Sequence, residues 1–191
     1  MKVRAAGGAT LMARFVALLR GVNVGRAKRV AMADLRKLLE SLGYGSVRTL
    51  LNSGNVVFDG PAEPRARHAR RIQAAVASEL GVDTLVIVKS ARDIAAIVAG
   101  NALADKATDP SRLLVAIPGD ARSLAILASP AMAERGSDEL HVGRHAAYVW
   151  CPNGILESKM AVALLDRVGE SGTTRNWSTV VKLHALLTRP A

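Results

Sequence analysis

The order of strand-like and helix-like segments in the first half of the chain limits the fold more than any other feature of the sequence. Short runs of apolar, β-branched residues predict strands, whereas apolar residues that recur every three or four positions predict helices. Strands are predicted at 15–20, 47–52, 55–59 and 84–90, and helices at 32–42 and 61–81. Their order along the chain is β-α-β-β-α-β, which is the order of a ferredoxin-like unit.

The Ser53-Gly54 pair separates two of these strands and predicts a hairpin turn, because glycine tolerates the positive φ that such turns require. In the ferredoxin-like arrangement we expect strands 15–20 and 55–59 to run parallel in the middle of the sheet, with both helices on one face. The loops that follow these two strands would then meet at one end of the sheet. The Ser53-Gly54-Asn55 turn would lie at the other end, about 17 to 20 Å away.

The second half of the chain predicts further strands and helices beyond a polar connector. A helix is expected at 91–99, and the connector "GNALADKATDPS" marks the boundary between two subdomains. The sequence then predicts a strand at 112–118, a helix from about 121, a hairpin at 139–150 that turns at Gly143-Arg144, a helix after "PNG" and a helix from Thr174. The fold class is therefore α+β. We divide the chain into a flexible tail at 1–12, a ferredoxin-like subdomain with its linking helix at 13–100 and a smaller α+β subdomain at 101–191.

The composition predicts a globular cytoplasmic protein. The 191 residues are 50% hydrophobic, which suffices for one sizeable domain or two small subdomains. No apolar run approaches the roughly 18 residues of a membrane span, and the opening "MKVRAAGGATLMARF" has no apolar signal-peptide segment, so no membrane partner is expected. Cys151 is the single cysteine, which excludes an intramolecular disulfide and a four-cysteine zinc site. Either Met1 or Met12 could be the true start.

Positive charge is concentrated in the first half of the chain. The formal net charge is +10. Residues 1–89 hold 15 Lys and Arg against 6 Asp and Glu, whereas residues 90–191 hold 11 against 10. A general compositional bias toward arginine would raise the positive charge of both halves of the chain equally. The asymmetry therefore favours an anionic partner, such as a phosphate, a nucleotide or a nucleic acid.

The connection at residues 21–31 is longer than the roughly 2 to 6 residues that usually join a strand to a helix, and long connections are often functional. The segment that begins with the last residue of the strand carries four cations, which are Arg20, Arg26, Lys28 and Arg29. The second helix carries four more near its start, which are Arg65, Arg67, Arg70 and Arg71. Because both segments would lie at the same end of the sheet, we expect a basic end where an anion binds beside helix N-termini.

Five residues form the predicted ligand site, namely Arg20, Asn23, Lys28, Lys159 and Arg175. Arg20 and Lys28 would bind the anion together with backbone N–H groups of the loop, and Asn23 would orient that loop. Lys159 lies in the first turn of the helix after "PNG". Arg175 follows Thr174, the expected N-cap of the last helix. Both cations would oppose the helix dipole unless an anion is bound.

No catalytic residue can be assigned, and no metal or cofactor site is predicted. The loop "GVNVGRAKR" matches neither the phosphate-loop pattern nor the dinucleotide-binding glycine pattern. Cys151 is expected to be an inert buried thiol, and His141 and His145 lack a third metal ligand at a suitable spacing. Trp177 is expected in the core, because apolar residues at helical spacing follow it.

Four stretches of the chain resemble a widespread bacterial family of proteins whose function is unknown. They are "ALLRGVNVG", "LLNSGNVVF", "PNGILESK" and "TTRNWSTVVKL", and together they extend over nearly the whole chain from Met12. The resemblance implies an α+β fold of two subdomains, of which the first is ferredoxin-like. It implies no established activity and no catalytic residue.

Three functions remain open from the sequence. The first is binding of a phosphate-bearing ligand or a nucleic acid at the basic end, which would depend steeply on salt. Base stacking on the sheet is not expected, because Phe15 and Phe58 are the only aromatic residues on the two strands that would carry it. The second is an enzyme that acts on an anionic substrate between the subdomains. The third is a structural homo-oligomer, although the sequence does not indicate an oligomeric state.

Overall fold

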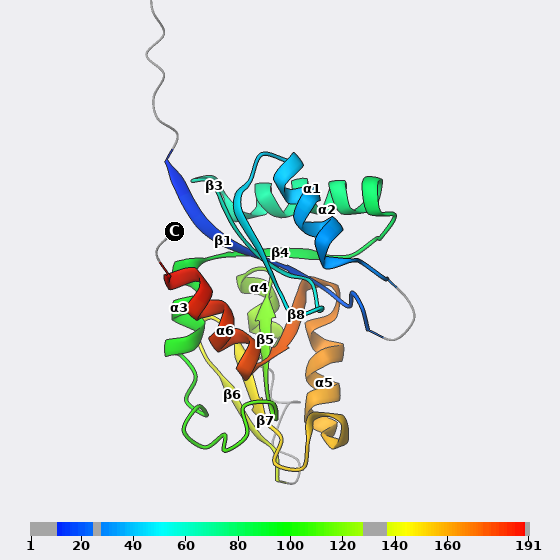
Figure 1. Ribbon diagram of the computed structural model, residues 1–191. Coiled ribbons are helices and arrows are strands. Elements are labelled where there is room, and N and C mark those ends of the chain that lie inside the picture. The colour runs from blue at the N-terminus through cyan, green and yellow to red at the C-terminus, as the bar shows by residue number, and fades with distance from the viewer. Residues whose placement is uncertain (1–10, 25–27, 128–136, 190–191) are drawn as a thin grey trace, which may run out of the picture.

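The computed structural model describes residues 11–24, 28–127 and 137–189, and these residues form two four-stranded sheets with flanking helices (Figure 1). The α+β class is therefore confirmed. The first sheet consists of β1 (Met12–Leu19), β2 (Gly45–Leu50), β3 (Asn55–Pro61) and β4 (Val86–Ser90). The helix α1 (Met32–Ser41) connects β1 to β2, and α2 (Arg65–Leu80) connects β3 to β4, which is the element order that the sequence predicts.

The direction of the strands differs from the prediction. The strand order is β2-β3-β1-β4 and every neighbouring pair is antiparallel, with Leu18 of β1 opposite Asn55 of β3. The expectation that strands one and three run parallel is therefore wrong. A crossover helix makes β1 parallel to β2, whereas the tight turn after β2 reverses the chain, so that β3 must run antiparallel to β1.

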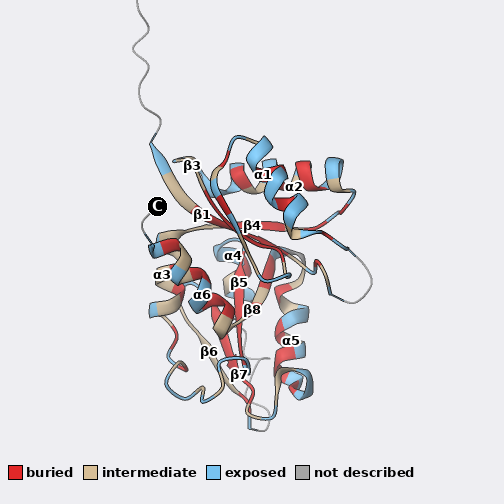
Figure 2. Cartoon of the chain, in the orientation of Figure 1, coloured by how far each residue is buried: buried red, intermediate tan, exposed pale blue. Residues whose placement is uncertain are grey.

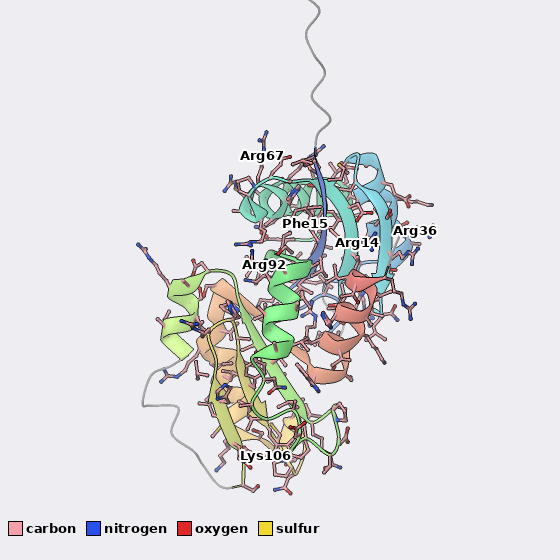
Figure 3. The ribbon with its side chains drawn as sticks, turned by 90° about the vertical axis from the view of Figure 1, so that its left-hand side faces the viewer. Arg14, Phe15, Arg36, Arg67, Arg92 and Lys106 are labelled. Atoms are coloured by element: carbon pink, nitrogen blue, oxygen red, sulfur yellow. The ribbon has the colours of Figure 1, made fainter. Side chains whose placement is uncertain are left out.

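This difference moves the two basic segments apart. The loop after β1 leaves the sheet at the end where β3 begins, whereas α2 starts at the opposite end, and Figure 3 shows Arg67 of α2 at the end where β1 begins. Arg65 and Arg67 instead form ion pairs with Asp93 and Glu63, at 2.9 and 2.8 Å. The predicted shared basic end is wrong. Arg26, which was part of it, lies outside the described residues.

The helices α1 and α2 cover the same face of the first sheet (Figure 2). Phe15, Ala17 and Leu19 alternate along β1 and pack beneath α1 and α2, whereas Val16 faces the other side of the sheet. The Phe15 ring stacks on Phe58 with 5.7 Å between the ring centroids. Because this pair is buried under the helices, neither ring is accessible to a nucleic-acid base.

The second sheet has the order β6-β7-β5-β8, again with antiparallel neighbours. Its strands are β5 (Leu113–Pro118), β6 (Glu139–Val142), β7 (Ala147–Trp150) and β8 (Gly172–Asn176). The remaining helices are α3 (Ala91–Ala99), α4 (Ala121–Leu127), α5 (Lys159–Val168) and α6 (Trp177–Thr188), with short 3-10 turns, η2 (Ile155–Glu157) and η3 (Gly169–Ser171). The sequence did not predict β8. The helix expected from Thr174 begins instead at Trp177, where the Asn176 side chain accepts the Thr179 N–H.

A common core lies between the two sheets. Val16 and Leu18 of β1 pack with residues of α3, α6 and β5, and this cluster includes the buried Trp177, as predicted. The other face of the second sheet packs against α5, where Met160 and Leu164 are buried. The division at 13–100 and 101–191 stays a prediction. Among the described helices, none combines the length and apolar character that crossing a membrane requires.

An ion pair between β1 and β3 should make the stability depend on acidification. Arg14 Nε donates to Asp59 Oδ1 at 2.9 Å, and this hydrogen bond holds the pKa of Asp59 below its ordinary value of 3.8. The unfolded state then binds the Asp59 proton more tightly than the folded state. The stabilisation is therefore present above 3.8 and is lost as the pH falls through the lowered pKa of the folded protein.

We expect this contribution to be about 1 kcal/mol or less, because both side chains are partly exposed. Urea unfolding of the native protein and of Asp59→Asn, at neutral pH and at a pH below that lowered pKa, would measure it. The native protein should lose more free energy of unfolding on acidification than the variant does. Equal losses would show that the pair does not contribute.

Candidate functional site

A cleft of about 520 Å³ opens where one end of the first sheet meets the second sheet. Figure 1 shows the loop after β1 close to β8 and the last turn of α5. The cleft is lined by Arg20, Gly21, Val22, Val24, Leu51, Ser53, Leu114, Ile155, Leu165, Val168, Thr173, Thr174, Arg175, Asn176 and Thr179. We call it the arginine cleft, because Arg20 and Arg175 are the two charged residues in the described part of its lining.

Arg175 extends from β8 to the first sheet and is only 8% exposed. Its Nε donates to Asn55 Oδ1 at 2.6 Å, and its Nη2 donates to the backbone carbonyls of Leu19 and Ser53 at 2.8 and 3.1 Å. These acceptors belong to the end of β1, the β2–β3 turn and the start of β3. The Arg175 side chain therefore links the second sheet to the first through hydrogen bonds.

The positive charge of Arg175 has only neutral oxygens around it. Its Nη1 donates to Thr173 Oγ1 and to the Thr174 carbonyl, at 2.8 and 2.7 Å, so all five N–H donors of the guanidinium are used. Burial lowers the pKa of Arg175 to about 10, which leaves the group charged at neutral pH. Among the residues that the structure describes, no Asp or Glu lines the arginine cleft, so the described lining does not offset its positive charge.

The loop after β1 is held by hydrogen bonds that place Arg20 at the cleft. The Arg20 N–H donates to the Leu85 carbonyl at 2.9 Å. Asn23 has a φ of 57°, and its Nδ2 donates to the carbonyls of Val30 and Asn52 at 2.8 and 2.7 Å. Its Oδ1 accepts the Val30 N–H at 3.0 Å. Asn23 thus ties together the two ends of the loop and the β2–β3 turn.

Lys28 lies on a second hollow of about 690 Å³, beside the arginine cleft. Arg20, Gly21 and Val24 line both spaces. The other residues of the hollow are Lys28, Gln73, Asp83, Thr84 and Leu85. The lining of this hollow therefore includes a carboxylate, that of Asp83, as well as the Lys28 ammonium group. Arg20 lies between a cleft whose described lining has no carboxylate and a hollow that has one.

The five predicted site residues are brought together only in part. Arg20 and Arg175 line the arginine cleft, Lys28 lies on the neighbouring hollow, and Asn23 supports the loop. Lys159 is exposed and begins α5 at the end of that helix remote from the first sheet (Figure 1). Arg175 lies in β8, so the prediction that it opposes a helix dipole from a first helical turn is wrong.

The Ser53-Gly54-Asn55 turn belongs to this site, although it was expected at the far end of the sheet. Because β3 is antiparallel to β1, Asn55 lies beside the end of β1, next to Arg175. Asn55 is fully buried, and its Nδ2 donates to two oxygens of the β2–β3 connection, both at 2.9 Å. An asparagine at the start of an apolar strand is a signal of such a site, because a buried amide needs polar partners.

Neither Cys151 nor a metal-binding cluster forms a competing site in the described residues. Cys151 is buried, and this burial raises the pKa of its thiol, which disfavours the reactive thiolate. Within 11–24, 28–127 and 137–189, no three His, Cys, Asp or Glu side chains lie close enough together to hold a metal ion. The His141 ring instead stacks on Tyr148, with 5.8 Å between the ring centroids.

Comparisons with known proteins identify the family. A solved structure, the conserved bacterial protein SP0830 from Streptococcus pneumoniae, has a similar fold with a TM-score of 0.72. It is 22% identical in sequence, and the match covers 93% of this chain and all of that one. No curated protein matches the chain. The family model described as "Protein of unknown function (DUF1697)" matches residues 12–148, and the chain therefore belongs to that family.

Proposed function

We propose that this protein binds a small phosphate-bearing anion in the arginine cleft. The proposal is carried by the buried guanidinium of Arg175, in a cleft whose described lining has no carboxylate. Burying a charge costs free energy unless an opposite charge or strong hydrogen bonds compensate it. The neutral oxygens around Arg175 satisfy its N–H groups but do not neutralise its charge. A bound anion would supply the missing opposite charge.

Arg20 provides the direct contact in this proposal. All the donors of Arg175 are engaged, so it attracts an anion through its electric field rather than through new hydrogen bonds. Among residues 11–24, 28–127 and 137–189, the Arg20 side chain has no hydrogen-bond or ion-pair partner, and its backbone N–H is held by the Leu85 carbonyl. A planar guanidinium in this position can bind two oxygens of one phosphate. Thr174, which also lines the cleft, can donate a third hydrogen bond from its hydroxyl.

This proposal favours binding of a small molecule over the alternatives. The part of the cleft lining that the structure describes has no carboxylate, histidine or cysteine that could act as a base or a nucleophile, so we do not assign catalysis to it. A nucleic-acid partner loses support, because the two basic segments that suggested it lie at opposite ends of the first sheet. We propose a cytoplasmic location, as the single free cysteine indicates.

Thermal unfolding in the presence of inorganic phosphate and pyrophosphate tests the proposal. The midpoint should rise with ligand concentration and should exceed the rise in sodium chloride of equal ionic strength, because a ligand that binds only the folded state stabilises it. Arg20→Gln should weaken the phosphate affinity by about tenfold to a hundredfold, the usual effect of losing a charged hydrogen bond.

Arg36→Gln is the matched control, because this substitution removes an equal charge from α1 (Figure 3). Arg36 is not among the described lining residues of either space. This variant should respond to phosphate as the native protein does. The proposal is wrong if phosphate stabilises no more than sodium chloride. It is also wrong if the Arg20 and Arg36 variants respond alike.

A further inference from the structure

We infer that the anion of the arginine cleft carries an unbranched aliphatic chain, as a monoalkyl phosphate does. The inference rests on the proposed anion binding and adds the class of ligand. Its basis is the apolar part of the cleft lining. Val24, Leu51 and Leu165 line the cleft and are 68%, 52% and 41% exposed. Single exposed apolar residues need no explanation, but three of them around one opening form a patch that a ligand could cover.

The buried and the exposed parts of the described lining differ in chemistry. The buried part mixes apolar side chains with polar groups, which come from Thr173, Arg175 and Thr179, at 2%, 8% and 4% exposure; its apolar members are Val22, Leu114 and Val168. The exposed side chains, by contrast, are all aliphatic, namely Val24, Leu51 and Leu165. Arg20 is of intermediate burial. A ligand that matches this arrangement places its charged group toward the polar groups and its apolar group against the exposed aliphatic residues.

The lining favours an alkyl chain over a nucleobase. Within 11–24, 28–127 and 137–189, no aromatic residue lines the arginine cleft, so a base would find no ring there on which to stack. Ile155 and Val168 instead continue the aliphatic lining that Leu165 begins. A volume of about 520 Å³ is within the usual range for a small-molecule site and has room for one phosphate and a short chain.

The backbone of Leu51 gives an independent indication. Its φ is 57°, in the left-handed region that is unfavourable for leucine and easier for asparagine or glycine. Its side chain is also half exposed, so the hydrophobic core does not require it. Neither the backbone nor the packing therefore favours a leucine here, whereas contact with an apolar ligand would.

Calorimetric titration with methyl, butyl, hexyl and octyl phosphate tests the inference. The affinity should rise about fourfold for each methylene group that becomes buried, until the chain extends beyond the cleft. Methyl phosphate measures the contribution of the anion alone. Octanol, which has the same chain without the charge, should bind much more weakly than octyl phosphate.

Substitutions at the opening separate the chain from the anion. Leu51→Asn and Leu165→Ser should each weaken octyl phosphate binding by about tenfold, the effect of losing a buried leucine contact, and should leave methyl phosphate binding unchanged. Leu51→Asn also relieves the unfavourable backbone, so it should fold. Val162→Ser is the matched control for Leu165→Ser. Val162 is 50% exposed and lies on α5, as Leu165 does, but it is not among the described lining residues of the cleft. It should bind every probe as the native protein does.

The outcomes distinguish this inference from the proposed function. Equal affinities for methyl and octyl phosphate would overturn the aliphatic chain and leave anion binding intact. No binding of methyl, octyl or inorganic phosphate would overturn both. If the protein sediments with phosphatidylglycerol vesicles but does not bind soluble octyl phosphate, it recognises a membrane surface and the inference is wrong.

Discussion

Arg175→Ala is expected to lower the free energy of unfolding by about 3 to 5 kcal/mol, the usual cost of removing one partner from a buried charged network. The substitution removes all five hydrogen bonds of the guanidinium. It leaves Asn55 Oδ1 and the Leu19 carbonyl without their partner inside the protein, and unsatisfied buried acceptors are costly. The loss exceeds the gain from no longer burying a charge, because the two sheets lose their polar link at this point.

Urea unfolding of three variants would measure this effect. Arg112→Ala is the matched control. The Arg112 side chain is half exposed, and it contacts Asp109 and the Pro152 carbonyl rather than the first sheet. This variant should therefore lose about 1 kcal/mol or less of its free energy of unfolding. The free energy lost in Arg175→Lys should lie between the losses in Arg175→Ala and Arg112→Ala, since a lysine keeps the charge but cannot present donors in five fixed directions. A loss in Arg175→Ala no larger than that in Arg112→Ala would show that the link is unimportant.

A double-mutant cycle of Arg175→Ala and Asn55→Ala would measure the coupling between these two side chains. Arg175 Nε and Asn55 Oδ1 are 2.6 Å apart and both residues are buried. We therefore expect the two losses to be non-additive by more than 1 kcal/mol, as is usual for residues that share a buried hydrogen bond.

The sequence predicted the local elements because local periodicity and turn residues determine them. Trp177 is in the core as predicted, and Gly81 caps the C-terminus of α2, where a φ of 64° suits glycine. The sequence failed to predict β8, because its residues Gly172–Asn176 are small and polar rather than apolar and alternating. A strand of this composition is stabilised by pairing with β5, which is a tertiary effect.

The candidate site was predicted in part for a similar reason. The length and charge of the loop after β1 indicated Arg20 directly. The contact of Arg175 with Asn55 depends on the packing of two sheets, which no local pattern encodes. The strand direction in the first sheet is different, because the hairpin turn after β2 reverses the chain and puts the start of β3, with Asn55, at the end of β1.

Gly54→Ala is expected to lower the free energy of unfolding by about 2 to 5 kcal/mol, the sum of two separate costs. The φ of Gly54 is 72°, in the region that disfavours a residue with a Cβ atom. A Cβ atom would also lie 2.5 Å from Val22 Cγ2 and 2.7 Å from Leu19 Cβ, both of which are buried. The β2–β3 turn packs closely on the end of β1, so neither neighbour can move away without disturbing the core.

Gly21→Ala separates these two costs. Gly21 has a similar φ of 63°, but no atom lies within 4 Å of the added Cβ position. Its substitution should therefore cost only the backbone strain, about 1 to 2 kcal/mol. The difference between the two variants in urea unfolding measures the steric contact of Gly54 with β1 and its loop. If Gly21→Ala is as destabilised as Gly54→Ala, the close packing is unimportant. A larger loss in Gly54→Ala would show that the β2–β3 turn needs this close packing. The same turn carries two acceptors of Arg175, the Ser53 carbonyl and Asn55 Oδ1, so a turn displaced by the extra methyl group would also weaken the link between the sheets.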